Sequence, residues 1–431
     1  MPLIRLECSE KTFAPGFSES LETVRDQFVL GDAVDFDMDA NRCPRLPTDL
    51  SFFALPEQQL LAYEKHREIS ELGHIFRIAN GLHDFIDAVV MTGSGAGCVG
   101  AQAIATACCD PYHNELSRAA RGSKPRIYFA DDSMDNDQIQ SLLGRLTAGG
   151  YGDGAADALW AIIAADRATP ADRPPLVLDH LVETLRSTTA ADADFGGRLI
   201  TAIGSTGAAI PEPLAALGLD QSLRVPDAID DRYSVLTPIG LLSSAFLGLD
   251  CIQLLVGAAA MNENFRNEPF EQNIVLRYAA MCRGRQRLFA WWPRRLCGLD
   301  RWLESLTSDH CRLDLAADSD REEFAARLDS GSPRCEELVC NHVQVDAIRT
   351  DPLPVTPNRE PQGDQARESV AERQAETAAT VSQQLTDRGI RQNTITLPVI
   401  DTHSLGQLLQ MLMLAAAIES EGAAGRFGSG V

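Results

Sequence analysis

The stretch that most constrains the fold of this chain runs from residue 87 to residue 107. Residues 88–92 are apolar or β-branched and predict a buried parallel strand, and glycines follow at positions 93, 95, 97 and 100. The alanine-rich run 101–107 then predicts a helix. A strand, a tight glycine turn and a helix N-terminus together form an anion cradle, because backbone N–H groups point outward there and the helix dipole favours negative charge.

Strands and helices alternate after this turn, which predicts a parallel sheet with helices on both faces. The further strands are expected at 126–130, 160–164 and 199–203, with helices at 137–148 and 176–188. This pattern gives a first α/β domain over residues 85–215. Residues 1–84 are expected to form an irregular and helical segment: the first 55 or so lack periodicity, and 55–81 show helical spacing of apolar residues.

A second α/β domain is predicted over residues 225–431. Its helices are expected at 250–262, 272–282 and 403–417, and its strands at 286–292 and 394–398. Residues 351–374 are rich in Pro, Asp, Glu, Arg and Gln and predict an exposed surface excursion.

Composition narrows the classes of partner and compartment. The net charge of −23 argues against nucleic acid and anionic membranes, which require a basic surface. The 11 cysteines include no CxxC pair, so neither a zinc site nor a disulfide framework is indicated. The N-terminus has no signal-peptide pattern, and no apolar run approaches the roughly 18 residues of a membrane span. We therefore expect a cytoplasmic protein.

Six blocks occur in the same order in one known family. They are VVMTGSGAGCVGAQAI (89–104), PYHNELSRAARGSKPRIYFADDSMDNDQIQSLL (111–143), DDRYSVLTPIGLLSSAFLGLD (230–250), GAAAMNENF (257–265), NIVLRYAAM (273–281) and SLGQLLQMLMLA (404–415). In these blocks the chain resembles bacterial glucose-6-phosphate isomerase. The resemblance implies two sugar-isomerase-type (SIS, flavodoxin-like) domains, a dimer, a sugar-phosphate substrate, and no metal or cofactor.

The resemblance assigns Gly93, Gly95 and Gly97 to the substrate and phosphate site. The family pattern is close to G-x-G-G-S-x-x-G-A, whereas this chain has Ala96 and Gly97 where the family has glycine and serine. One hydroxyl contact to phosphate is therefore expected to be lost.

A second phosphate loop is expected after the strand at 160–164. The family has S-K-S-G-G-T or a similar sequence there, and this chain has D-R-A-T-P-A at 166–171. Arg167 and Thr169 remain as candidate phosphate ligands. Asp166 would repel a phosphate, since one like-charge pair at about 4 Å and an effective dielectric near 20 is worth roughly 4 kcal/mol. We predict that this loop does not bind phosphate in the family's way.

Two catalytic residues are carried over from the family. Arg232 stands in D-D-R-Y-S, where the family has G-G-R-[FY]-S, and would stabilise the enediolate. Glu304 stands in W-L-E-S-L and would move the proton between C2 and C1. Asp230 and Asp231 replace two glycines, and we expect them to pair with Arg232 and occupy it.

Two further catalytic groups of the family are not found. The ring-opening histidine aligns with Phe324 or with a glutamate just before it. The family's last lysine follows a Gly-Val pair, and the sequence ends at about that pair, at Val431. Loss of one general acid typically lowers a rate by about 100- to 10,000-fold.

Several functions remain open on this basis. The first is a weak glucose-6-phosphate isomerase, acting in glycolysis and gluconeogenesis. The second is a non-catalytic relative that acts as a binding or regulatory partner, as a homodimer or as a heterodimer with an isomerase subunit. The third is a dinucleotide-binding protein, because Gly95, Gly97 and Gly100 match a GxGxxG turn. The last is a decaying gene product without function. We expect little or no isomerase activity.

Overall fold

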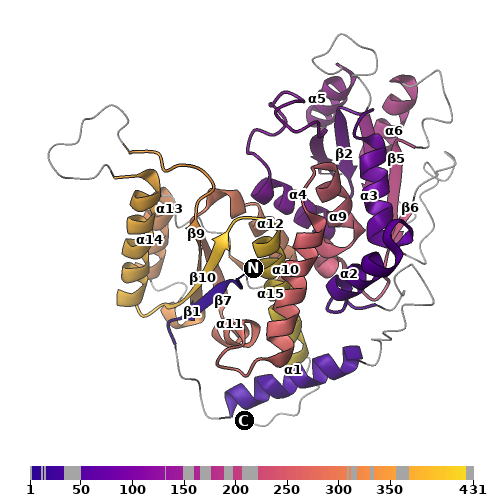
Figure 1. Ribbon diagram of the computed structural model, residues 1–431. Helices are drawn as coiled ribbons and strands as arrows, with labels where there is room; N and C mark the ends of the chain where they lie inside the picture. Colours follow the sequence, from indigo (N-terminus) through magenta and orange to yellow (C-terminus); the bar gives the residue numbers. More distant parts are fainter. Residues whose placement is uncertain are drawn as a thin grey trace. The chain divides into compact units, whose positions relative to one another are not determined.

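The computed structural model describes residues 2–10, 13, 16–33, 50–131, 133–148, 160–165, 176–188, 198–205, 222–307, 310–311, 318–330, 334–355 and 368–423. It divides into two compact units (Figure 1). The glycine-turn unit comprises residues 32–256, and the C-terminal unit comprises residues 1–31 and 257–431. Each unit has its own sheet, and the predicted α/β class is confirmed.

The sheet of the glycine-turn unit is entirely parallel, in the order β3-β2-β4-β5-β6. Its strands are β2 (Ala88–Thr92), β3 (Arg126–Ala130), β4 (Trp160–Ala165), β5 (Ile200–Ser205) and β6 (Ser222–Val225). Its helices are α2 (Leu55–His66), η1 (Arg67–Ile69), α3 (Glu71–Leu82), α4 (Ala96–Cys108), α5 (Asn136–Thr147), α6 (Leu176–Thr188), η3 (Asp231–Leu236) and α9 (Pro238–Phe246). The strands and helices predicted between 88 and 203 are present, with ends within about two residues except that α4 begins five residues before the predicted 101–107.

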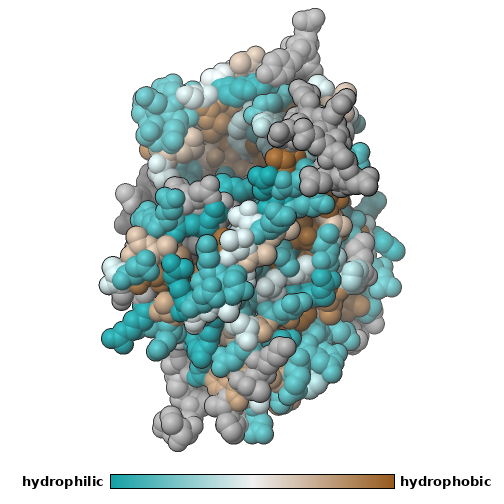
Figure 2. All heavy atoms as spheres, turned by 90° about the vertical axis from the view of Figure 1, so that its left-hand side faces the viewer, coloured by the Kyte–Doolittle hydropathy of each residue, from teal (hydrophilic) through white to brown (hydrophobic). Residues whose placement is uncertain are grey.

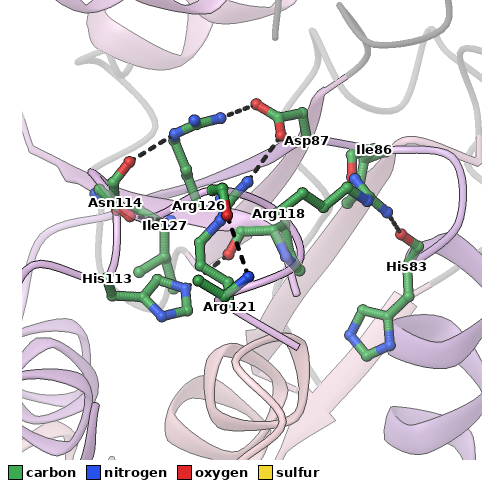
Figure 3. A network of polar contacts seen from close by, with 12 residues as sticks. His83, Ile86, Asp87, His113, Asn114, Arg118, Arg121, Arg126 and Ile127 are labelled. Atoms are coloured by element: carbon green, nitrogen blue, oxygen red, sulfur yellow. Dashed lines mark hydrogen bonds and ion pairs between the residues drawn. The ribbon is translucent and has the colours of Figure 1, made fainter. Parts of the chain in front are cut away.

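The N-terminal edge of this sheet is held by an ion-pair network (Figure 3). Asp87, just before β2, accepts hydrogen bonds from Arg126 at the start of β3 and from Arg121, whose nitrogen lies 2.9 Å away. Arg118 donates to the carbonyl oxygens of Ile86, at 2.7 Å, and of His83. Because both arginines that reach Asp87 are almost fully buried, the carboxylate neutralises charge that would be costly to leave unpaired. Block 111–143 of the sequence therefore serves the scaffold at this edge.

The C-terminal unit has the sheet order β1-β10-β9-β7-β8, parallel throughout except for β1, which pairs antiparallel with β10. Its strands are β1 (Arg5–Cys8), β7 (Gln286–Trp291), β8 (His310–Cys311), β9 (Leu338–Ala347) and β10 (Arg391–Val399). Its helices are α1 (Phe17–Ala33), α11 (Ile274–Cys282), η4 (Arg294–Leu296), α12 (Leu299–Leu306), α13 (Asp318–Asp329), η5 (Cys335–Glu337), α14 (Val370–Asp387) and α15 (Thr402–Ala423); α10 (Cys251–Asn267) crosses the boundary between the units.

Alternation along β7 sends its side chains to two different cores. Leu288 and Ala290 pack with α13 and α14, in a cluster that includes Phe324 and Val381. Phe289 and Trp291 face the other way; their rings stack with centroids 5.0 Å apart, and the Trp291 indole donates to Asp300 of α12 at 2.6 Å. In Figure 1, α13 and α14 lie on one side of this sheet and α11, α12 and α15 on the other.

Three expectations for this unit need correction. The irregular lead-in instead contains β1 and α1. Strand β9, at the centre of the sheet, was not predicted. The excursion predicted over 351–374 overlaps the start of α14, which begins at Val370, and its middle, 356–367, lies outside the described residues.

Candidate functional site

The predicted strand and helix are present as β2 and α4, and the glycine turn connects them. The turn lies at the point where the strand order of the sheet reverses, since the chain passes from β2 to β3 on one side and returns to β4 on the other. Ligands of open parallel sheets bind at such a switch point, outside the carboxyl ends of the strands. Gly93 has a φ of 153°, and a Cβ atom there would lie 2.0 Å from the carbonyl oxygen of Ala165 at the end of β4. Only glycine fits at this position.

The N-terminus of α4 is occupied by a carboxylate of the protein itself. The backbone N–H of Ala96 donates to Oδ2 of Asp231, 2.6 Å away, and the N-cap residue of α4, Gly95, offers no side-chain cap. A Cβ atom on Gly95 would lie 2.5 Å from the same oxygen. A carboxylate at a helix N-terminus satisfies an otherwise unpaired N–H and interacts favourably with the helix dipole. Asp231 thus takes the place that the anion cradle offers to a ligand.

Ser234 closes the turn from the same side. Its hydroxyl donates to the backbone oxygen of Asp231 at 2.6 Å, which fixes the first turn of η3. A Cβ atom on Gly97 would lie 2.3 Å from the Ser234 hydroxyl oxygen. Gly95 and Gly97 are therefore needed for the close approach of η3 to α4.

Arg232 projects away from this contact. Its Nε lies 3.4 Å from Oδ1 of Asp230, its guanidinium carbon lies 5.1 Å from the centre of the Tyr233 ring, and its side chain is 40% exposed. Both aspartates were expected to pair with Arg232. Asp230 does so, whereas the carboxylate of Asp231 is bound to α4 instead.

The other predicted residues lie elsewhere. Arg167 and Thr169 lie outside the described residues. Glu304 belongs to the C-terminal unit, on the exposed face of α12 opposite the buried Trp302 and Leu303. Phe324, aligned with the ring-opening histidine, is buried on α13 in the core formed with β7 and α14.

A cavity that sequence reasoning missed lies in the C-terminal unit, at the corresponding edge of its sheet. It has a volume of about 410 Å³. Its lining comes from the segment after β7, the end of β9 and the N-terminal half of α14; the residues are Trp292, Pro293, Arg294, Arg295, Gln344, Val345, Ala347, Ile348, Arg349, Thr350, Ala371, Gln374, Ala375, Ala378 and Ile400. The signal that could have revealed it is the pair of arginines directly after the predicted strand 286–292, where parallel sheets bind ligands.

Among the described residues, no group of three or more His, Cys, Asp or Glu side chains is arranged to hold a metal ion. In the same part of the chain, no helix is long and apolar enough to cross a bilayer.

Comparison with known proteins finds similar sequences in one family. The model of the phosphoglucose isomerase family matches residues 187–319, a range that contains both Arg232 and Glu304. Glucose-6-phosphate isomerase of Listeria monocytogenes serotype 4b is 25% identical over 210 residues, which is 49% of this chain and 44% of the relative. That of Carboxydothermus hydrogenoformans is 27% identical over 225 residues, 52% of this chain and 44% of the relative. The chain is therefore similar to phosphoglucose isomerases over part of its length. The chain spans less than half the length of the curated relatives it matches.

Solved structures show the same fold over nearly the whole chain. A hypothetical protein of Thermus thermophilus aligns with a TM-score of 0.69 at 18% identity, covering 97% of this chain and 94% of that one. A glucose-6-phosphate isomerase of Chlamydia trachomatis aligns with a TM-score of 0.65 at 12% identity, covering 98% and 86%. The predicted fold of two α/β domains with parallel sheets flanked by helices is therefore confirmed.

Proposed function

We propose that this chain is a sugar-isomerase scaffold with little or no glucose-6-phosphate isomerase activity. The observation that carries the proposal is the 2.6 Å hydrogen bond from the Ala96 N–H to Asp231. A phosphate entering the turn would have to displace this carboxylate or sit beside it. Two like charges about 4 Å apart at an effective dielectric near 20 repel by roughly 4 kcal/mol, which is enough to weaken binding by about a thousandfold.

The catalytic groups support the same proposal. Arg232 is engaged with Asp230, so its charge is partly neutralised before any enediolate forms. Phe324 is packed in a core and carries no proton to transfer. Among the carried-over residues that the structure describes, only Glu304 keeps an exposed acid–base group.

The test compares the wild type with Asp231→Gly and Asp231→Asn. We expect no measurable conversion of fructose 6-phosphate to glucose 6-phosphate by the wild type in a coupled assay, and little binding of 6-phosphogluconate. Asp231→Gly removes the internal anion and should bind 6-phosphogluconate measurably. Asp231→Asn keeps an oxygen that can accept from Ala96, so it should gain less.

A control variant and an opposing result complete the test. Glu183→Gln removes an exposed carboxylate on α6 of the same unit and should leave 6-phosphogluconate binding unchanged. The proposal is overturned if the wild type turns over substrate at a robust rate that Glu304→Gln abolishes.

Binding of a dinucleotide at this turn is opposed by the same carboxylate, Asp231. In a GxGxxG turn the second glycine allows the backbone to approach a pyrophosphate. Here Gly97 instead admits Ser234, and Asp231 holds the helix N-terminus. We expect no saturable binding of NADH.

The remaining role is a binding or regulatory one on an isomerase scaffold, with a residual sugar phosphate or with a second isomerase subunit as partner. Such a partner, in a homodimer or a heterodimer, stays a proposal that co-purification from the native host would test. Recovery of the chain without any isomerase subunit would count against the heterodimer.

A further inference from the structure

We propose that the C-terminal unit binds an extended basic peptide of a partner protein, which adds as a strand to the outer edge of β1. This site goes beyond the proposed function, which concerns the turn between β2 and α4 in the other unit. Three observations carry the proposal: the backbone groups on the edge of β1, a cavity beside that edge, and the charge of the cavity lining.

The backbone of β1 presents hydrogen-bonding groups on its outer side. This strand lies at one end of its sheet, with β10 as its neighbour. The N–H of Ser9 donates to the carbonyl oxygen of Gln392 at 2.8 Å, in a register that places Cys8 opposite Asn393. Backbone groups of an antiparallel strand point alternately toward and away from the neighbouring strand. Since Ser9 points toward β10, the N–H and C=O groups of Cys8 and Leu6 point away from it.

Two side chains occupy parts of this edge. The carbonyl oxygen of Leu6 accepts a hydrogen bond from the guanidinium of Arg277 at 3.3 Å, as expected for a group that points away from β10. Before β1, the side chain of Gln407 accepts from the Ile4 N–H at 2.7 Å and donates to the Pro2 carbonyl oxygen at 3.2 Å. Gln407 therefore closes the edge before the strand. Within the strand, a peptide N–H would replace the long hydrogen bond from Arg277.

A cavity of about 650 Å³ lies beside the outer edge of β1. Its described lining comes from β1, the segment that leads into α1, the turn between α10 and α11, and α11 itself; the residues are Leu6, Glu7, Cys8, Glu10, Phe13, Ser18, Phe270, Glu271 and Arg277. All of them belong to the C-terminal unit. Because Arg277 both lines the cavity and reaches the outward carbonyl oxygen of Leu6, the cavity lies on the side of β1 that faces away from β10. A strand added there would find both hydrogen-bonding groups and space.

An aromatic wall of the cavity is held in place by α1. The rings of Phe13 and Phe270 meet edge to face with their centroids 5.4 Å apart. The N–H of Phe270 donates to the Glu22 carboxylate of α1 at 2.8 Å, and Arg25 of α1 donates to the carbonyl oxygen of Glu268 at 2.7 Å. Since this wall is ordered before a peptide arrives, binding costs less conformational entropy. Side chains on one face of an extended peptide would pack against it.

The charge of the lining favours a basic peptide. Glu7, Glu10 and Glu271 line the cavity, against one arginine in its described lining. Arg277 is held by the backbone of β1, and Glu10 pairs with Arg391 at 2.8 Å. Glu7 and Glu271 are exposed and face solvent cations or those of a ligand. The net charge of −23 also attracts cationic partners over longer distances.

A peptide fits these features better than a small cation or a broad apolar surface does. A small cation would use the carboxylates and leave the outward backbone groups of β1 unused. A broad apolar partner needs a continuous apolar face. Figure 2 looks onto the molecule from the side of α13 and α14, where hydrophilic side chains predominate and apolar ones form small patches. Strand addition uses the backbone for affinity and the side chains for specificity.

The experiment measures binding of the acetylated and amidated heptapeptide VKVKVKV to the full chain by calorimetry. We expect a Kd below about 1 mM for this peptide and no binding of VEVEVEV or of butylammonium at that concentration. The form of VKVKVKV that is N-methylated at every residue has no N–H donors and should bind at least about tenfold more weakly. Hydrogen exchange should slow at the amides of Leu6 and Cys8 when VKVKVKV is bound, whereas the amide of Glu7 points toward β10 and should not respond.

Variants of the protein test charge and backbone separately. Glu7→Gln/Glu271→Gln removes two carboxylates of the lining and should weaken VKVKVKV binding by about tenfold or more. The matched control Glu322→Gln/Glu323→Gln removes the same charge from exposed positions of α13 and should change the affinity by less than about twofold. Cys8→Pro removes an outward N–H that the β1–β10 ladder does not use, so it should weaken binding by about tenfold while β1 stays paired.

One further control separates this site from the glycine turn. Asp231→Gly should leave the affinity for VKVKVKV unchanged, so an active wild-type isomerase would refute the proposed function without touching this site. The N-methylated peptide tests the same backbone bonds as Cys8→Pro without altering the protein. The inference is wrong if VKVKVKV does not bind, if the N-methylated peptide or butylammonium binds equally well, or if exchange at Leu6 and Cys8 does not change.

Discussion

The switch points of the two sheets have the same topology, but one is filled by side chains of the protein and the other contains a cavity. When the parallel strands of each sheet are numbered in chain order, the first four run 2-1-3-4. They are β3-β2-β4-β5 in the glycine-turn unit and β8-β7-β9-β10 in the C-terminal unit. In the first, Asp231 and Ser234 fill the space beside the turn. In the second, small residues of α14 leave a cavity lined by arginines. Topology therefore locates the edge at which a ligand can bind, and individual side chains decide whether it can enter.

The comparison also separates a motif from its usual meaning. Glycines after a parallel strand normally allow a phosphate to approach the backbone. In this chain they allow another part of the chain to approach, since a Cβ atom on Gly95 or Gly97 would meet η3 at 2.5 or 2.3 Å. The open switch point, after β7, has Trp292 and Pro293 where the closed one has glycines.

Among the variants that test this comparison, Gly93→Ala is expected to lose the most stability. The added methyl would lie 2.0 Å from a backbone oxygen of β4, and the φ of 153° is unfavourable for alanine. Backbone cannot move aside as a side chain can, so we expect a loss of about 3 kcal/mol or more in the free energy of unfolding. Urea denaturation followed by circular dichroism measures this loss.

Gly144→Ala is the matched control. It lies within α5 with nothing within 4 Å of its Cβ position, so alanine should be neutral or stabilising by up to about 1 kcal/mol. If both variants lose equal stability, the close packing of β4 against the turn is not what requires glycine at position 93.

Gly97→Ala is expected to lose less stability than Gly93→Ala, because the added methyl would meet a side chain, which can shift, and not the backbone. The methyl would lie 2.3 Å from the Ser234 hydroxyl oxygen, and overpacking of this kind costs about 1–3 kcal/mol. Ser234→Ala removes that atom, so the double variant should recover part of the loss relative to the sum of the two single variants. A double-mutant cycle from chemical denaturation gives the coupling, and additive losses would show that η3 does not press on α4.

The sequence predicted the glycine-turn unit well because its strands carry simple signals. Strands β2 and β4 consist of apolar or β-branched residues throughout, so their ends could be placed to within one residue. What the pattern could not supply was the contact between α4 and Asp231, which join segments more than 130 residues apart in the chain. An aspartate next to an arginine predicts an ion pair, and only the fold shows that a helix N-terminus is the nearer partner.

Strand β9 escaped prediction because its core is polar. Asn341 and His342 are buried at the centre of the sheet, where periodicity alone indicates a loop. They are satisfied across the ladder: the Asn393 side chain of β10 donates to Asn341 at 2.9 Å, and the side chain of Asn341 donates to the Leu288 carbonyl at 3.2 Å. With β9 unrecognised, the arginines after the predicted strand 286–292 remained the one sequence signal of the switch point beside it.

The smallest effect concerns one buried histidine in each unit. The indole of Trp292, a donor only, points its Nε1 at Nδ1 of His342 at 3.3 Å, so the ring proton must sit on Nε2, which donates to Gln392 at 2.9 Å. In the other unit, the ring of His83 lies between the carbonyl oxygen of Phe246, at 3.1 Å, and the ammonium of Lys124, at 3.3 Å. Burial is the main cause that lowers the pKa of both rings below 6.5, and Lys124 adds to it for His83.

The sign of the pH dependence follows from these lowered pKa values. Below pH 6.5 the histidine rings bind protons in the unfolded chain but stay neutral in the folded protein. The free energy of unfolding therefore falls as the pH decreases, by at most about 1.4 kcal/mol per pH unit for each ring. His342→Gln and His83→Gln should each flatten the curve of unfolding free energy between pH 7 and pH 5, whatever they do to stability at pH 7. If only His83→Gln flattens the curve, burial beside Trp292 does not keep the His342 ring unprotonated between pH 7 and pH 5.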